Sequence, residues 1–152
     1  MKKVYIDMDN VLVNFQSGID RLDERTKREY EGFLDEVPGI FSLMDPMPSA
    51  LESIDKLSEH FDLYVLSTAP WKNPSAWSDK VIWLHKHFGA EKESIFYKRL
   101  IISHHKELNK GDFLIDDREK NGAKKFSGEL IQFGTSDFPE WVTVTNYLLK
   151  KA

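Results

Sequence analysis

Short runs of mostly apolar residues recur along the chain, and most of them end abruptly in polar residues. Such runs occupy positions 4–6, 61–66, 113–115 and 130–133. Uninterrupted apolar positions are typical of strands buried on both faces of a parallel sheet. Three of the runs are followed by carboxylate or hydroxyl side chains that could take part in catalysis, within 7–9, 67–68 and 116–117. The pattern therefore predicts four strands, three of which carry reactive groups at one end.

Helical periodicity fills the gaps between these runs. Apolar residues recur at near-helical spacing over 51–61, after a capping box that begins at Ser49, and over 77–88, before a stop at Gly89. A third helix is predicted over 141–148, after a capping start at Asp137. Alternating strands and helices predict right-handed crossovers. The fold class is therefore α/β, a Rossmann-like three-layer sandwich with a central parallel sheet, and ligands are expected beyond the carboxyl ends of its strands.

The segment from about 15 to 45 does not follow this alternation. It holds a charged helical stretch over 20–30, an apolar stretch over 37–41, and then a turn-rich stretch that begins at Asp45. We interpret it as a small helical cap, inserted after the first strand and covering the crevice, within one domain that spans 1–152. The alternative that the pattern leaves open is a surface insertion that does not cover the crevice.

Composition narrows the class of protein. The chain has 152 residues, a formal net charge of −4 and no cysteine. Without cysteine, a disulfide scaffold, a Cys-ligated zinc site and thiol catalysis are excluded, and the acidic balance argues against a surface for nucleic-acid polymers. No apolar run reaches the ~20 residues of a membrane span, and acidic residues interrupt the N-terminal apolar stretch, unlike in a signal peptide. We expect a cytoplasmic protein that binds neither a nucleic-acid polymer nor a membrane.

Aspartates at two strand ends point to a divalent cation. Asp7 and Asp9 are two positions apart and share one side of an extended segment, while Asp116 and Asp117 add negative charge to the same edge. Crowded carboxylates repel one another unless a cation or a proton lies between them. Oxygen ligands of this kind suit Mg²⁺. A single aspartate here is also a common turn or helix cap, but two acidic pairs at strand ends favour a metal site.

Hydroxyl and lysine side chains complete a candidate phosphate site. Ser67 and Thr68 end the second long strand, where their hydroxyls can donate to a phosphoryl oxygen. A transferring phosphoryl group also needs positive charge around it. The candidates are Lys72, Lys80, Lys98, Lys106 and Lys110. Position near the start of the helix over 77–88 favours Lys80, although spacing alone does not choose among them.

Taken together, these motifs resemble the haloacid dehalogenase-like (HAD) phosphohydrolase superfamily. They are DMDNVL near the N-terminus, LST after a mid-chain strand, a downstream lysine and LIDDR. Within the superfamily the chain looks most similar to the 5′(3′)-deoxyribonucleotidase family, through FSLMDPMP, STAP, KVIWL, HFG and LIDDR. The resemblance covers most of the chain, from about residue 3 to 135. It implies a Mg²⁺-dependent phosphatase that acts on (deoxy)nucleoside monophosphates through an aspartyl-phosphate intermediate.

The resemblance implies catalytic roles for matched residues. Asp7 matches the nucleophile, and Asp9 matches the general acid/base that protonates the leaving alkoxide and then activates water. Asp7, the backbone carbonyl of Asp9, and Asp116 match the Mg²⁺ ligands. Ser67 matches the phosphate-binding hydroxyl, and Lys80 matches its positive partner.

Substrate-binding roles are implied in the same way. Thr68 matches a residue that helps to hold substrate, and Lys106 matches a further lysine on the phosphate side. Phe15 and Phe41 match aromatic residues around the base. His104 stands where the family has a substrate-contacting arginine.

Two further departures and two rival functions complete the prediction. Asn10 replaces the commoner glycine after the second aspartate, and the cap is short. A phosphatase for sugar phosphates or another small phosphoester is therefore the alternative function, because the cap selects the substrate. A phospho-receiver signalling domain, which also uses an acidic cluster and Mg²⁺, is the alternative from another class. The expected partner is a small phosphomonoester, and a homodimer is left open.

Overall fold

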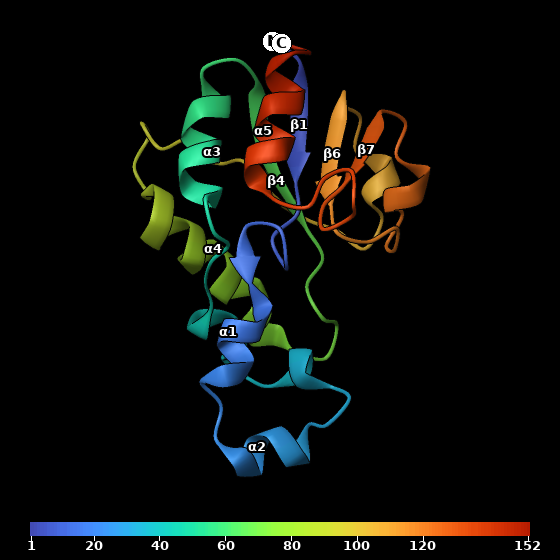
Figure 1. The fold of residues 1–152 in the computed structure, drawn as a ribbon. Coiled ribbons are helices and arrows are strands. Elements are labelled where there is room, and N and C mark those ends of the chain that lie inside the picture. The colour runs from blue at the N-terminus through green and yellow to red at the C-terminus, as the bar shows by residue number, and fades with distance from the viewer.

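A five-stranded parallel sheet forms the centre of the molecule in the computed structural model, which describes residues 1–152 (Figure 1). The spatial order of its strands is β5-β4-β1-β6-β7, so the first strand lies in the middle. The bounds are β1 Lys3–Ile6, β4 Asp62–Ser67, β5 Leu100–Ile102, β6 Phe113–Asp116 and β7 Glu129–Gln132. This order brings the ends of β4, β1 and β6 next to one another.

Alternate residues of the strands build two apolar cores. Val4 and Ile6 of β1 belong to the main core, whereas Tyr5 belongs to a smaller cluster with Leu114 and Phe126. Side chains alternate between the faces of a sheet, so the two cores lie on opposite faces. Both faces of the sheet are thus covered, which explains the mostly apolar strand sequences.

The sheet lies between a helical layer and a thinner layer of short 3₁₀ turns. Helices α3 (Ala50–Ser58) and α5 (Trp141–Leu149) pack against each other beside the sheet (Figure 1). The smaller core includes Ala123 of η4 (Ala123–Lys125), which packs with η3 (Lys106–Leu108). The α/β three-layer class predicted from the sequence is confirmed.

The residues between β1 and α3 stand apart from the sheet, at the end opposite the chain termini (Figure 1). They form β2 (Val13–Asn14), α1 (Phe15–Asp20), α2 (Glu24–Glu29), η1 (Leu34–Glu36), η2 (Ile40–Leu43) and β3 (Asp45–Pro46). Helix α4 (Pro74–Phe88) packs against η2, and the Trp83 indole donates to the Met44 carbonyl at 2.9 Å. The segment is therefore anchored to the helix that follows β4.

Several local predictions need correction. Strand β5 was not predicted, although its three residues, Leu100–Ile102, form an apolar run as long as the one at 4–6. The stretch 20–30 is not one helix: α1 ends at Asp20, and Asp23 caps α2 by accepting from the Thr26 amide at 2.7 Å. Helix α4 begins at Pro74, three residues earlier than expected, because proline suits the first turn.

Two predicted helix caps are also wrong. Ser49 has a φ of 63° and makes no side-chain cap to α3, because its left-handed backbone is not the extended conformation of a capping box. Helix α5 is capped by Glu140 instead of Asp137, through its carboxylate and the amides of Val142 and Thr143. None of the helices has the length and apolar composition needed to cross a bilayer.

Candidate active site

Three neighbouring strands deliver their polar ends to one place. Asp7 directly follows β1, Asp116 ends β6 and Ser67 ends β4, and β1 lies between the other two strands. The Asp7 amide extends the ladder by donating to the Ile115 carbonyl at 2.9 Å. All three side chains are buried. The convergence predicted at the carboxyl ends of the strands therefore follows from the strand order.

A buried lysine lies between two of these carboxylates. Lys106 Nζ is 3.0 Å from Asp7 Oδ1 and 2.5 Å from Asp116 Oδ2. Burial by itself lowers the pKa of Lys106, but the charges of Asp7 and Asp116 and their hydrogen bonds outweigh it and raise the pKa. Lys106 therefore carries a proton at neutral pH and balances part of the buried negative charge.

Three carboxylates form a cluster that suits a hard cation. Oxygens of Asp7, Asp116 and Asp117 lie within 4.8 Å of one another, and Asp117 Oδ1 is buried without a hydrogen-bond partner. Burial, then the charge of Asp7, raises the pKa of Asp116 to about 6 and that of Asp117 to about 7. Because a single lysine does not neutralise this cluster, the residues fit Mg²⁺, which prefers carboxylate oxygens.

Asp9 lies outside this cluster and has its own buried cation. Lys80 Nζ is 3.1 Å from Asp9 Oδ1, and the lysine side chain is fully buried. Phe41 packs beneath the same ammonium, whose nitrogen is 4.3 Å from the ring centroid. Burial raises the pKa of Asp9, the charge of Lys80 opposes the rise, and Asp7 adds to it. A carboxyl group with a raised pKa is suited to carry and release a proton.

The two hydroxyls at the end of β4 differ in their partners. Ser67 Oγ is buried and has no hydrogen-bond partner. Thr68 Oγ1 donates to the Ser103 carbonyl at 2.7 Å, which holds the chain after β4 against the chain after β5. An unpartnered buried hydroxyl needs an explanation, and a bound oxyanion at this position would provide one.

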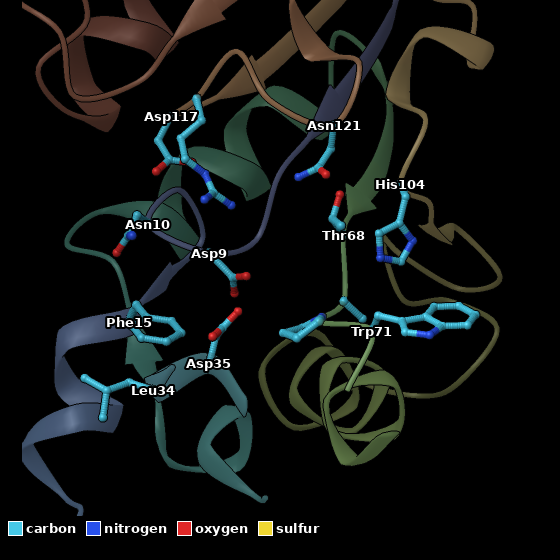
Figure 2. A pocket seen from close by; sticks show the side chains of 13 residues that line it. Asp9, Asn10, Phe15, Leu34, Asp35, Thr68, Trp71, His104, Asp117 and Asn121 are labelled. Carbon is cyan, nitrogen blue, oxygen red and sulfur yellow. The ribbon is translucent and has the colours of Figure 1, made fainter. Parts of the chain in front are cut away.

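A pocket of about 590 Å³ opens beside these groups (Figure 2). Of the predicted site residues, Asp9, Phe15, Thr68 and His104 line it. The other predicted residues are buried and outside the lining: Asp7, Phe41, Ser67, Lys80, Lys106 and Asp116. The site thus has an enclosed charged part, around the carboxylates, and an outer part that can receive a larger group.

The two predicted aromatic residues take different positions. Phe15 and Phe41 meet edge to face, with ring centroids 5.8 Å apart. Only Phe15 lines the pocket, whereas Phe41 is 3% exposed and packs against Lys80. Lys106 likewise contacts Asp7 and Asp116 from within the protein.

Several lining residues were not predicted from the sequence. Leu34 and Asp35 come from η1, and Arg118 and Asn121 follow β6. Trp71, whose place just after the end of β4 suggests a position at the border of the crevice, does line the pocket. The pattern gave no signal for Leu34 or Asp35, because short 3₁₀ turns have no clear periodicity. Arg118 could have been found from its place beside the acidic pair.

Asn10, the departure noted after the second aspartate, has a φ of 60°. This left-handed conformation favours glycine, and asparagine tolerates it better than most other residues. Its backbone N–H donates to the Val13 carbonyl at 2.8 Å and closes the turn between β1 and β2. Asn10 therefore meets the backbone requirement that glycine normally meets, and the turn that carries Asp9 keeps its shape.

Comparison with known proteins gives consistent results. The family described as "5′ nucleotidase, deoxy (Pyrimidine), cytosolic type C protein" matches residues 23–140. A protein of Vibrio phage KVP40, provisionally named a 5′(3′)-deoxyribonucleotidase, is 57% identical over 145 residues, which cover 95% of this chain and 83% of the phage protein. The human 5′(3′)-deoxyribonucleotidase, cytosolic type, is 27% identical over 77% of this chain and 71% of its own length.

A solved structure shares the fold. The provisional HAD-hydrolase YfnB of Bacillus subtilis, determined bound to magnesium, has a TM-score of 0.62 and 13% sequence identity. The likeness covers 97% of this chain and 98% of that protein. At this identity the likeness bears on the fold alone.

Proposed function

Because this chain belongs to the family of 5′ nucleotidases described as deoxy (pyrimidine), cytosolic type C, we propose that it hydrolyses the phosphomonoester of (deoxy)nucleoside monophosphates. The observation that carries the proposal is the paired arrangement of Asp7 with Lys106 and of Asp9 with Lys80, beside one pocket. Family membership argues against a phospho-receiver domain.

Asp7 acts as the nucleophile in this proposal. One of its oxygens attacks phosphorus, the bond to the leaving oxygen breaks, and an aspartyl phosphate forms on Asp7. The departing alkoxide takes a proton from Asp9, which then accepts a proton from the water that hydrolyses the aspartyl phosphate. The raised pKa of Asp9 supports this order of events, because the group must hold a proton before the first step.

Asp7, the backbone carbonyl of Asp9, and Asp116 would hold Mg²⁺, with Asp117 as a further nearby carboxylate. When bound, Mg²⁺ neutralises negative charge on the phosphoryl group. Lys106 neutralises Asp7 and Asp116 from the protein side, and Lys80 keeps Asp9 oriented. The free hydroxyl of Ser67 would donate to a phosphoryl oxygen.

The outer part of the pocket would receive the rest of the substrate. Phe15, Thr68 and His104 line it, and Phe41 supports Phe15 from behind. We propose that the segment of about 15–45 is the cap that closes over this part, because it supplies Phe15, Leu34 and Asp35. The human relative is named a cytosolic type, in keeping with a cytoplasmic site of action. A homodimer stays a prediction.

Phosphate release tests the proposal. The purified chain is incubated with Mg²⁺ and single deoxynucleoside 5′- and 3′-monophosphates, ribonucleoside monophosphates or sugar phosphates, and inorganic phosphate is measured. We expect turnover of nucleoside monophosphates that requires Mg²⁺. A sugar phosphate preferred by tenfold or more would instead favour the alternative phosphatase, and no release from any substrate would contradict both.

A further inference from the structure

Trp71 is the most exposed large aromatic residue beside the pocket. The residue is 79% exposed, and it lines the pocket opposite Phe15 in Figure 2. The indole is supported by His104, whose ring centroid lies 6.0 Å away, and His104 in turn lies 6.0 Å from Trp77. An exposed indole at the mouth of a pocket, held from one side, offers its remaining surface to a planar ligand.

Asp35 brings a carboxylate into the same outer part. It lines the pocket, and Figure 2 shows its carboxylate directed inward, between Phe15 and Trp71. Among lysines and arginines, only Arg118 lines the pocket. Lys80 and Lys106 are buried and already paired with Asp9, Asp7 and Asp116. A second phosphate on a substrate would therefore meet a carboxylate and little positive charge.

Asn73 fixes the loop that carries Trp71 and the segment that carries Asp35 relative to each other. It is 1% exposed, and its amide donates to the carbonyls of Asp35 and Val37 at 2.9 and 3.0 Å. Its own oxygen accepts from Ser75, whose hydroxyl also accepts from the Gly39 amide at 2.9 Å. Because Trp71 is two residues before Asn73, this network joins the loop of Trp71 to the segment of Asp35.

From these contacts we infer that Trp71 and Asp35 select the leaving group. Trp71 stacks on a planar base, and Asp35 accepts a hydrogen bond from a neutral donor while repelling a second anion. Among phosphomonoesters, these two residues therefore favour a nucleoside over a bare sugar as the leaving group, and they exclude nucleoside bisphosphates. This inference rests on the proposed phosphatase function.

Three substrates that share a deoxyribose 5-phosphate separate the role of Trp71 from that of Asp35. They are 2-deoxyribose 5-phosphate, a deoxynucleoside 5′-monophosphate and the corresponding 3′,5′-bisphosphate, compared by kcat/KM in each variant. We expect Trp71→Ala to lower the ratio of monophosphate to deoxyribose phosphate about tenfold, as for loss of one stacked base, and Trp71→Phe to restore most of it. We expect Asp35→Asn to raise the ratio of bisphosphate to monophosphate about fivefold, a modest effect because the carboxylate is exposed.

Glu36→Gln is the matched control, because Glu36 is in the same 3₁₀ turn as Asp35 but does not line the pocket. It should keep both ratios. Unchanged ratios in both Trp71→Ala and Asp35→Asn would overturn the inference while leaving the proposed function intact. If wild type releases phosphate from none of the three, the proposed function fails, and calorimetric binding of the same compounds to Asp7→Asn then decides the inference by the same two ratios.

Discussion

Lys106 Nζ lies 3.0 Å from Asp7 Oδ1, although the two residues are 99 positions apart in the chain. The same nitrogen is 2.5 Å from Asp116 Oδ2, so a single ammonium bridges the ends of β1 and β6. This contact therefore affects both the stability of the fold and catalysis, because the carboxylate that Lys106 stabilises is also the proposed nucleophile.

Removal of this ammonium should cost both stability and activity. Lys106→Met leaves two buried carboxylates without their partner, and breaking a buried ion pair typically costs about 3–5 kcal/mol. Urea unfolding followed by circular dichroism measures the loss. Lys124→Met is the control, since Lys124 is 76% exposed and pairs with Glu119 at 3.7 Å. Equal stability of the two variants would show that Lys106 does not balance the cluster.

Asp7 and Asp9 should be indispensable in different ways. Asp7→Asn is expected to abolish turnover, because no nucleophile remains. Asp9→Asn should slow phosphate release by about 10² to 10⁴, the usual contribution of an acid/base group. Single-turnover and steady-state phosphate release would measure both. Near-wild-type rates in either variant would contradict the assigned roles.

Magnesium should stabilise the fold as well as support activity. The cluster of Asp7, Asp116 and Asp117 carries more negative charge than Lys106 balances. Excess EDTA is therefore expected to stop phosphate release, and added Mg²⁺ to restore it and to raise Tm. In Asp116→Asn the rise in Tm should be lost. A wild-type Tm that does not respond to Mg²⁺ would argue against a metal at these carboxylates.

Asn73 should contribute to stability through its buried amide. Asn73→Ala leaves the carbonyls of Asp35 and Val37 without their donor, and an unsatisfied buried group costs about 1–3 kcal/mol. Chemical denaturation gives the difference in the free energy of unfolding. Asn146→Ala, at an exposed position of α5, should change little. A loss no greater than that of the control would mean that the loop and the segment 35–37 are not coupled.

His87 should make stability fall in mild acid. Its Nε2 is buried without a partner, and its ring lies 4.2 Å from that of Trp83. Burial, and then the charge of Lys86, lowers the pKa of His87 below its ordinary 6.5. The unfolded chain therefore binds a proton first, so this contribution is present above pH 6.5 and is lost as the pH falls through the folded-state pKa.

Replacement of His87 by phenylalanine tests this pH dependence. His87→Phe should flatten the loss of unfolding free energy between neutral pH and mild acid, measured by denaturation at several pH values. His60→Gln, which changes an exposed histidine, should keep the wild-type profile. A profile for His87→Phe that falls as steeply as wild type would assign the acid sensitivity to other groups.

Four of the five strands of the central sheet, and the polar groups at the ends of three of them, could be predicted from the sequence alone. Strand β1 with Asp7 and β6 with Asp116 could be read from short apolar runs followed by aspartates, because burial on both faces leaves a local pattern. The parallel arrangement then implied that these ends would meet. Family membership also agreed with the motifs around the aspartates.

The pairing of the charged side chains, and most of the residues around the pocket, could be seen only in the three-dimensional structure. Lys80 reaches Asp9 from 71 positions away, and Phe41 packs beneath that lysine and does not line the pocket. Asp35 also lines the pocket, and a buried asparagine joins its segment to the loop of Trp71. Periodicity records whether a position is buried, but it does not record the partner, which depends on how distant segments pack together.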